Sequence, residues 1–371
     1  MVAYTVTPWE VSGDIDYARL IKDFGTSPLS DVLLKRIEKL AGGLHHMLRR
    51  KIFFSHRDLD ILLRKHEQGN TFALYTGRGP SGNTHIGHLV PWLFTKWLQD
   101  RFGAELYFQI TNDEKFFIKD LSLEETTRLA YENALDVIAL GFDPEKTHIF
   151  IDTEYAKTLY GIAAQVARRV TFSQAKAVFG FSNETNLGLA FWPAMQAAPC
   201  FLPSVLKKRK VPVLIPAAID QDPYWRISRD VAPRLGYEKP AAIHCVFLPP
   251  LQGAGGKMSA SEAESAVFTT DSAAEVKRKI LKYAFSGGQA TVEEHRKLGG
   301  NPDVDVAYQW LRFFEEDDSV LAQLYKDYRS GALLTGELKM LLIRKLTGFL
   351  EDHQRERERA RKRLDEFLLR D

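Results

Sequence analysis

The chain has 371 residues, of which 45% are apolar and 26% charged, and its 50 lysines and arginines nearly balance its 48 aspartates and glutamates. A net charge of +2 excludes a histone-like or membrane-coating protein, but it permits a local nucleic-acid surface. No apolar run approaches the ~20 residues of a membrane span, and the N-terminus has no signal-peptide pattern. We therefore expect a cytoplasmic protein without membrane contacts.

Both cysteines, Cys200 and Cys245, stand in apolar runs and form no C-x-x-C pair. This pattern predicts buried thiols rather than a disulfide or a metal site. We expect no metal ligands among the protein's own side chains.

In chain order, residues 1–70 predict a hairpin around Trp9 and then helices, and we treat them as an N-terminal extension. The run TFALYT (71–76) is short, apolar and β-prone. A glycine-rich loop separates it from apolar residues that recur at i, i+3, i+4 and i+7 from Ile86, which predicts a strand, a loop and a helix. The run AELYFQITND alternates apolar and polar residues, so a second strand with one polar face is expected.

Ser122 and Glu125 form a capping-box pattern before a helix that ends at Gly141, and HIFID, VPVLIPAAIDQDPYW and AAIHCVFLPP each contain a further strand. Strands that alternate with helices predict an α/β fold with a Rossmann-type, doubly wound parallel sheet over residues 71–272. From residue 273 to 371 only amphipathic helical patterns remain. A C-terminal all-helical domain is therefore expected there.

The loop TGRGPSGNTHIGH places His85 and His88 at the start of the expected helix. Bare backbone amides and the positive end of a helix dipole make such a loop an anion site, although it matches neither the P-loop nor the G-x-G-x-x-G pattern. Each imidazole can donate a hydrogen bond to a phosphate or ribose oxygen. The alternative is that one histidine caps the helix and the other packs.

A second loop, GAGGKMSAS, combines three glycines with Lys257, Ser259 and Ser261. A mobile loop that carries one cation and two hydroxyls can close over a triphosphate and neutralise the charge that moves to the leaving group. Taken alone, the same residues fit an exposed surface loop equally well.

Together, HIGH at 85–88 and KMSAS at 257–261 resemble the paired HIGH and KMSKS signatures of class I aminoacyl-tRNA synthetases. The motifs YTGRGPS, TNDEK, FGF, QAAP, AIDQDPY and DVAPRLGY, with IFFSHRD before them, are similar to tryptophanyl-tRNA synthetases of the eukaryotic and archaeal type over most of the chain. The chain departs from the general class pattern at Ala260, where a second lysine would stand. Alanine is usual there in that subfamily, and the departure puts more weight on Lys115 for phosphate charge.

The resemblance implies a ligase that converts L-tryptophan and ATP to tryptophanyl-adenylate and pyrophosphate, and then passes tryptophan to tRNA(Trp). The substrate carboxylate attacks the α-phosphate directly, so the protein must align the two and stabilise charge. Mg²⁺ is expected on the phosphates, and a homodimer is implied. The helical domain would read the anticodon, with Trp310, Phe313 and Phe314 as candidates for either base stacking or core packing.

The residues implied as catalytic or ATP-binding come from the two motif loops and from the ends of expected strands. Asp220 suits ribose hydroxyls, Gln221 suits the substrate carboxylate or ribose, and Arg78 suits ATP or the acceptor end of tRNA. The implied catalytic set is His85, His88, Lys257 and Lys115. The implied ATP set is Gly77, Arg78, Gly79, His85, Gly87, His88, Asp220, Gln221, Lys257, Met258, Ser259 and Ser261.

Tryptophan presents a large apolar ring with one N–H donor, and leaving that donor unpaired in a pocket costs ~1–3 kcal/mol. By the resemblance, Tyr75 and Gln109 would read the indole N–H. Glu114 and Gln196 would hold the α-ammonium group, and Gln221 would complete the tryptophan site. The alternative for Gln109 is a solvent-facing strand residue.

Tyrosyl-tRNA synthetase is the nearest alternative, but a phenol calls for an acidic acceptor paired with a tyrosine, whereas Gln109 occupies the acceptor position. A small nucleotidyltransferase also uses an H-x-G-H loop, but such enzymes lack the late KMSAS loop and the helical domain. An idle paralogue that acts as an interaction protein through residues 1–70 has no need of intact His85, His88 and Lys257.

Overall fold

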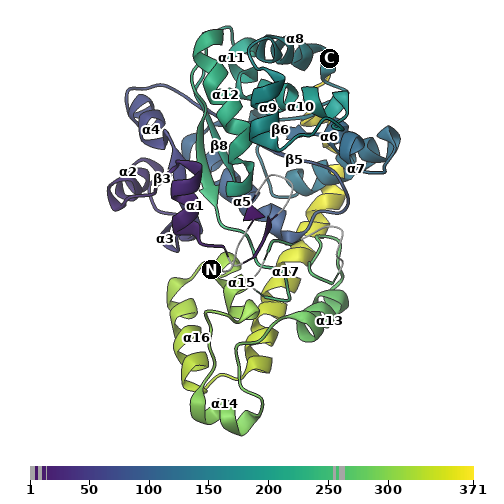
Figure 1. Ribbon diagram of the computed structural model, residues 1–371. Coiled ribbons are helices and arrows are strands. Elements are labelled where there is room, and N and C mark those ends of the chain that lie inside the picture. Colours follow the sequence, from purple (N-terminus) through teal and green to yellow (C-terminus); the bar gives the residue numbers. More distant parts are fainter. Residues whose placement is uncertain (1–4, 7–10, 14, 254–255, 259–263) are drawn as a thin grey trace.

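A seven-stranded sheet forms the centre of the upper part of the molecule, and a helical region extends below it (Figure 1). The computed structural model describes residues 5–6, 11–13, 15–253, 256–258 and 264–371. The strand order is β3-β4-β9-β8-β5-β6-β7, in which the five strands from β9 to β7 are parallel and β3 and β4 are antiparallel. The strands are β3 Ser27–Pro28, β4 Phe53–Arg57, β5 Ala73–Arg78, β6 Glu105–Ile110, β7 Thr147–Ile151, β8 Val213–Ala218 and β9 Ala241–Cys245.

Each face of the sheet has its own buried core, because successive side chains of a strand point to opposite faces. Leu106 and Phe108 of β6 belong to one core, whereas Tyr107 between them belongs to the other. This confirms the predicted doubly wound α/β fold. The helices around the sheet are α1 Tyr17–Phe24, α2 Asp31–Ala41, α3 His46–Arg49, α4 Leu59–Glu67, α5 Ile86–Phe102, α6 Asn112–Ile118, α7 Leu123–Ile138, α8 Ala156–Ala167, α9 Phe172–Phe179, α10 Leu187–Ala197, α11 Leu202–Leu206 and α12 Asp222–Leu235, with 3-10 turns η1 Pro144–Lys146, η2 Ala198–Cys200 and η3 Ile219–Gln221.

The strand order reverses direction at β5. The chain runs from β5 outward through β6 to β7, and later returns on the other side of β5 with β8 and β9. At such a switch point the connections leave to opposite faces, so a crevice opens at the carboxyl ends of β5 and β8. The loop that carries His85 follows β5, and Asp220 follows β8. The topology therefore brings these two residues to one edge of the sheet.

The N-terminal extension is more closely integrated with the sheet than the sequence suggested. Strands β1 (Thr5–Val6) and β2 (Val11–Ser12) pair antiparallel on either side of the expected hairpin position. The expectation of only a hairpin and helices for residues 1–70 is wrong in one respect, because β3 and β4 lie there and β4 pairs with β9. A five-residue strand between two helices is too short for a periodicity argument to recognise.

The C-terminal region is all-helical, as predicted, and its longest helix returns to the sheet domain. His353 and Arg357 of α17 contact Asp136 of α7, with His353 Nε2 3.0 Å from the Asp136 carboxylate. Beyond α17, Leu368 forms a parallel bridge with Ile149 of β7. The helices are α13 Ala273–Tyr283, α14 Val292–Leu298, α15 Val306–Phe314, α16 Asp318–Ser330 and α17 Thr335–Arg361, followed by the 3-10 turn η4 Leu364–Glu366.

The aromatic side chains singled out in α15 are part of the protein core. Trp310, Phe313 and Phe314 are all buried, and the Trp310 Nε1–H donates to the Pro249 carbonyl at 2.9 Å. These three side chains therefore pack in the core and are not available to stack on bases. The two cysteines are buried free thiols, as predicted. In the described residues, no helix has the length and apolar character needed to cross a membrane.

Candidate active site

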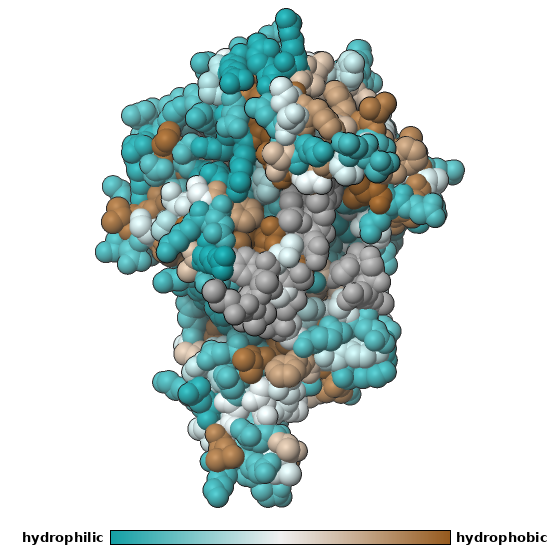
Figure 2. Space-filling view, in the orientation of Figure 1, coloured by the Kyte–Doolittle hydropathy of each residue, from teal (hydrophilic) through white to brown (hydrophobic). Residues whose placement is uncertain are grey.

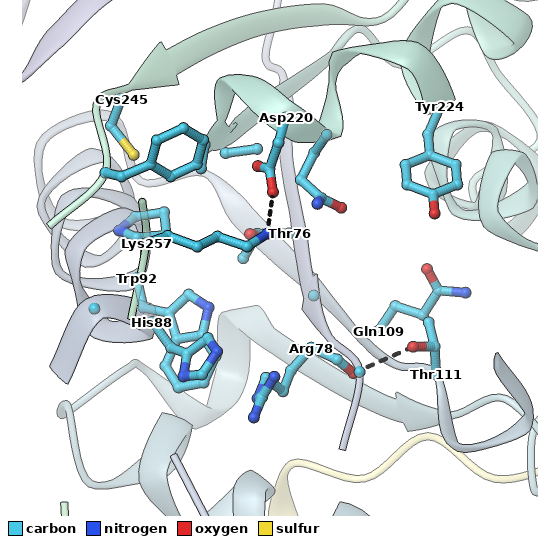
Figure 3. Close-up of a pocket in the computed structure, with 18 of the residues that line it drawn as sticks. Thr76, Arg78, His88, Trp92, Gln109, Thr111, Asp220, Tyr224, Cys245 and Lys257 are labelled. Carbon is cyan, nitrogen blue, oxygen red and sulfur yellow. Dashed lines mark hydrogen bonds and ion pairs between the residues drawn. The ribbon is translucent and has the colours of Figure 1, made fainter. Parts of the chain in front are cut away.

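A cavity of about 260 Å³ opens at the carboxyl ends of the parallel strands, and residues from both sequence motifs line it. The ends of β5, β6 and β8 converge there with the N-terminus of α5 and the segment that holds Lys257 (Figure 3). Of the predicted site residues within the described chain, every one except Tyr75 lines this cavity. Those lining residues are Gly77, Arg78, Gly79, His85, Gly87, His88, Gln109, Glu114, Lys115, Gln196, Asp220, Gln221, Lys257 and Met258. Ser259 and Ser261 lie outside the described residues.

His85 and His88 begin α5 as a stacked pair, with ring centroids 3.5 Å apart. The His85 backbone N–H donates to Nδ1 of His88 at 3.2 Å, so the capping alternative holds for His88 in part. Nδ1 of His85 is buried and has no hydrogen-bond partner in the described chain. Burial, and then the charges of Arg78 and Lys257, lower the pKa of both histidines well below the usual value. Neutral rings are thus present, and His88 carries its proton on Nε2 because Nδ1 accepts.

Lys257 reaches across the cavity to the end of β8, where its Nζ lies 2.6 Å from Oδ2 of Asp220. Figure 3 shows Lys257 between Asp220 on one side and His88 on the other. The lysine side chain is 34% exposed, whereas Asp220 is 2% exposed, so solvent reaches only the cation of this pair. A partly exposed lysine can leave its carboxylate for a more highly charged anion at modest cost.

The two motif loops are joined by backbone hydrogen bonds. The Ile86 N–H donates to the Val267 carbonyl at 3.0 Å, and the Thr269 N–H donates to the Thr84 carbonyl at 2.9 Å. The segment that carries Lys257 runs from Leu251 to Ser265, and the Leu251 N–H donates to the Ser265 carbonyl at 3.0 Å, which joins its two ends. The chain that carries Lys257 therefore leaves and re-enters the fold at one closed neck beside the histidine loop.

Gly79, directly after β5, leaves room for the largely buried side chain of Lys115. A Cβ atom at Gly79 would lie 2.1 Å from Cε of Lys115 and 2.8 Å from its Nζ. Nζ of Lys115 is 3.1 Å from the carboxylate of Glu114, and burial lowers the pKa of this lysine below its usual value. No larger residue can replace Gly79 without moving the Lys115 ammonium group.

Arg78 projects toward the same space from the end of β5. Its Nε donates to Oδ1 of Asn133 at 3.2 Å, while its buried Nη2 has no hydrogen-bond partner in the described residues. Burial lowers the pKa of Arg78 to about 10, so the guanidinium stays charged at neutral pH. Arg78 thus lines the cavity as a cation that keeps one donor without a partner in the described residues.

The part of the cavity away from Lys257, Lys115 and Arg78 is formed by a network of hydrogen-bonded polar side chains. The Tyr75 hydroxyl donates to Oε1 of Gln109 at 2.5 Å, and Nε2 of Gln109 donates to both carboxylate oxygens of Asp152 at 2.9 Å. Gln109 and Tyr75 are completely buried, so the solvent-facing alternative for Gln109 is wrong. Tyr75 lies one layer behind the cavity wall, where it supports Gln109. Oε1 of Gln196 is also buried and unpartnered in the described chain.

Several residues of this part were missed by sequence reasoning. Trp192, Tyr224 and Trp225 line this part of the cavity, and Trp225 packs edge-to-face on Tyr75 with centroids 5.3 Å apart. Phe247 lines the part beside Lys257, whose Nζ lies 5.9 Å from the centre of the Phe247 ring. Tyr224 and Trp225 directly follow the AIDQDP run, so their position after a strand was a usable signal. Asp152 had no such signal, because its role depends on the pairing of β6 with β7.

A parallel sheet with a cavity at its switch point, lined by the HIGH motif and by Lys257 and Met258 of the KMSAS motif, defines a class I aminoacyl-tRNA synthetase. The family model "tRNA synthetases class I (W and Y)" matches residues 67–351. A curated tryptophan–tRNA ligase from Saccharolobus solfataricus is 54% identical over 366 residues, covering 98% of this chain and 95% of that protein. This chain therefore belongs to the tryptophan–tRNA ligase family.

Solved structures give the same result. A tryptophanyl-tRNA synthetase from Giardia lamblia superposes with a TM-score of 0.90 at 42% identity, covering 95% of this chain and 96% of that chain. A tryptophanyl-tRNA synthetase from Encephalitozoon cuniculi, bound to tryptophan, superposes with a TM-score of 0.89 at 37% identity, covering 96% of this chain and 98% of that chain. The nucleotidyltransferase alternative is thereby excluded, and of the two specificities in the family model, the relatives are specific for tryptophan.

Proposed function

We propose that this tryptophan–tRNA ligase forms tryptophanyl-adenylate from L-tryptophan and ATP in the cavity at the ends of β5, β6 and β8. The observation that carries the proposal is that one cavity is lined by the two motif loops and by Gln109. Cationic and N–H donor groups suited to phosphates lie at one end, and an amide acceptor among aromatic rings lies at the other. A nucleotide and an indole can therefore meet there.

At the phosphate end, the tryptophan carboxylate attacks the α-phosphorus, and the bond from that phosphorus to the bridging oxygen breaks as pyrophosphate leaves. Negative charge moves toward the leaving group. Lys257 exchanges Asp220 for those oxygens, and Arg78 and Lys115 add fixed positive charge. The neutral rings of His85 and His88 donate hydrogen bonds, and this group as a whole is aimed at charge that develops in the transition state.

At the tryptophan end, the ring lies among Trp192, Tyr224 and Trp225, and its N–H donates to Gln109. The Gln109 carbonyl oxygen has two lone pairs, of which the Tyr75 hydroxyl uses one. The unpartnered Oε1 of Gln196 and the carboxylate of Glu114 hold the α-ammonium group. Gln221 holds the substrate carboxylate or a ribose hydroxyl beside Asp220.

Mg²⁺ is expected on the phosphates of ATP. In the described part of the chain, no group of three or more histidine, cysteine or acidic side chains is placed to hold a metal ion. When bound, the ion neutralises part of the triphosphate charge. Ser259 and Ser261 remain predicted ATP ligands.

The remaining partners follow from the reaction of the family. The adenylate passes its tryptophan to tRNA(Trp), whose anticodon we assign to the helical domain 273–371, beyond the catalytic domain 71–272 and the extension 1–70. A translation enzyme acts in the cytoplasm, and we propose that location.

A homodimer is supported by exposed apolar side chains on neighbouring helices. Leu187 is 89% exposed, Tyr160 is 63% exposed, and Phe116 is 44% exposed. Figure 2 shows hydrophobic groups toward the upper right, in the part of the molecule where Figure 1 places α6 and α10. Exposed apolar surface of this kind marks association sites. Light scattering of the purified protein is expected to give the mass of a dimer, and the mass of a monomer would reject this assignment.

The decisive experiment is ATP–pyrophosphate exchange with each of the twenty amino acids offered singly. Exchange with tryptophan is expected, because only an indole both fills the aromatic site and donates to Gln109. Exchange with tyrosine alone, or with no amino acid, would reject the proposed function.

A further inference from the structure

The amide of Gln109 needs a partner that fixes its orientation. An amide has an acceptor end and a donor end of nearly the same shape, and only the acceptor end can receive an indole N–H. Tyr75 cannot make this choice alone, because a hydroxyl can both donate and accept. A group that only accepts, placed on the far side of Gln109, would direct the amide hydrogens away from the cavity.

Asp152 occupies that position. It directly follows β7, and its backbone N–H donates to the Ile110 carbonyl at 3.1 Å, which places it beside the end of β6. Both of its carboxylate oxygens lie 2.9 Å from Nε2 of Gln109. Asp152 is 1% exposed and does not line the cavity, so it can affect a ligand only through the side chains that it contacts, of which Gln109 is a cavity residue.

A second carboxyl group explains how Asp152 is kept an acceptor. Asp113 of α6 makes a side-chain hydrogen bond with Asp152, and both groups are buried. Burial raises the pKa of Asp113 to about 6 and that of Asp152 well above its usual value. Two carboxyl groups in contact hold one proton between them. With the proton held there, the oxygens of Asp152 accept from Gln109.

Asp113 is itself fixed by donors. The Glu114 backbone N–H donates to its Oδ1 at 2.7 Å, and Nε1–H of Trp192, a cavity residue, donates to the same atom at 3.3 Å. The chain of contacts from Trp192 through Asp113 and Asp152 to Gln109 is therefore continuous.

We propose that Asp152, held by Asp113, is a positioning residue that fixes the amide orientation of Gln109 and thereby sets the preference for a substrate with a ring N–H. This inference rests on the proposed contact between Gln109 and the indole. Asp152 and Asp113, which do not line the cavity, would then contribute to the preference for tryptophan over a substrate without a ring N–H.

The test compares tryptophan with its benzothiophene analogue, in which sulfur replaces the ring N–H and the shape is kept. ATP–pyrophosphate exchange at about pH 8, where free carboxyl groups are ionised, gives kcat and KM for each substrate. Asp152→Ala removes the acceptor, and we expect its preference for tryptophan to fall about tenfold through a higher tryptophan KM, with kcat near the wild-type value.

Asp152→Asn is the conservative variant. Its amide donates to the Asp113 carboxylate and its carbonyl accepts from Gln109, so we expect the wild-type preference to be retained. The matched control is Glu154→Gln on the same loop, whose carboxylate accepts from the Tyr131 hydroxyl instead. This variant is expected to keep the wild-type ratio.

The possible results distinguish a failure of the positioning role of Asp152 from a failure of the proposed ligase activity. An unchanged ratio in Asp152→Ala, together with a lost preference in Gln109→Ala, would overturn the positioning role and leave the proposed function intact. Wild-type protein without tryptophan-dependent exchange would reject the proposed function itself. If Asp152→Ala does not fold, Asp152→Ser carries the same expectation, because its hydroxyl is too short to reach Gln109. An Asp152→Asn protein with wild-type thermal stability and a tenfold loss of preference would also overturn the proposal.

Discussion

The proposed phosphate end and the proposed tryptophan end of the cavity are built differently. At the phosphate end, Lys257 is partly exposed and held by one carboxylate, and Nδ1 of His85 has no partner among the described residues. At the tryptophan end, Tyr75, Gln109 and Asp152 are buried and joined in a continuous network. The phosphate end is suited to exchange partners while charge moves, and the tryptophan end is suited to hold one shape. Substitutions at the first should thus alter rate, and those at the second should alter selection.

The largest effect is expected for Lys257→Ala. In the proposed mechanism the lysine stabilises charge that appears on pyrophosphate only during the reaction, so kcat for adenylate formation should fall about 10²- to 10³-fold with little change in tryptophan KM. Rapid-quench measurement of the adenylate burst checks this. A normal burst would show that the segment has a structural role only.

Gly79→Ala is expected to lower the rate by about 10- to 100-fold, since the new Cβ displaces the Lys115 ammonium group from the phosphate end. The control is Gly161→Ala in α8, where a Cβ meets no atom within 4 Å, and whose helix should gain up to about 1 kcal/mol. Pyrophosphate exchange and thermal unfolding of both proteins decide the matter. Equal rates in the two variants would remove Lys115 from the chemistry.

Gln109→Ala tests the proposed tryptophan end of the cavity. Loss of the acceptor should raise tryptophan KM about tenfold and leave ATP KM unchanged, because one hydrogen bond in a buried site is worth ~1–3 kcal/mol. Steady-state exchange with each substrate varied in turn measures both constants. A proportional rise in ATP KM would mean that the two ends are not separate.

The smallest effect concerns stability and pH. Asp113 and Asp152 have raised pKa values in the folded protein, so their contribution to stability is fully present below the unfolded pKa and is lost as pH rises. For Asp113 the loss spans roughly pH 4 to 6, from its ordinary pKa to the value of about 6. Asp152→Asn lacks the coupled proton, so its free energy of unfolding should improve relative to wild type between pH 5 and pH 8. Denaturant unfolding at both pH values measures this difference, and a constant difference would contradict the shared proton.

The two ends of the cavity also differ in how much of them could be predicted from the sequence. That His85, His88 and Lys257 meet in one cavity could be predicted from the sequence, because they lie in short contiguous motifs whose chemistry is local. The α/β alternation and the capping box at Ser122 were equally local, and the structure has both.

What could not be predicted depends on contacts between distant elements. The pairing of Lys257 with Asp220, and of Gln109 with Asp152, is set by strand order and register, which periodicity does not contain. Strand β4 was missed because its five residues acquire their role only beside β9. The sequence allowed either base stacking or core packing for the aromatic residues of α15, and their burial in the structure shows that they pack in the core.

The closed neck between Leu251 and Ser265 has a practical consequence for engineering. Since the segment between them leaves and re-enters the fold at one point, we expect its exchange for the corresponding segment of another class I enzyme to leave the path of the sheet unchanged, provided that a buried residue replaces Met258. In the proposed mechanism such chimeras would carry the cation that stabilises the leaving group, and the amino-acid preference would stay with the strands of the host.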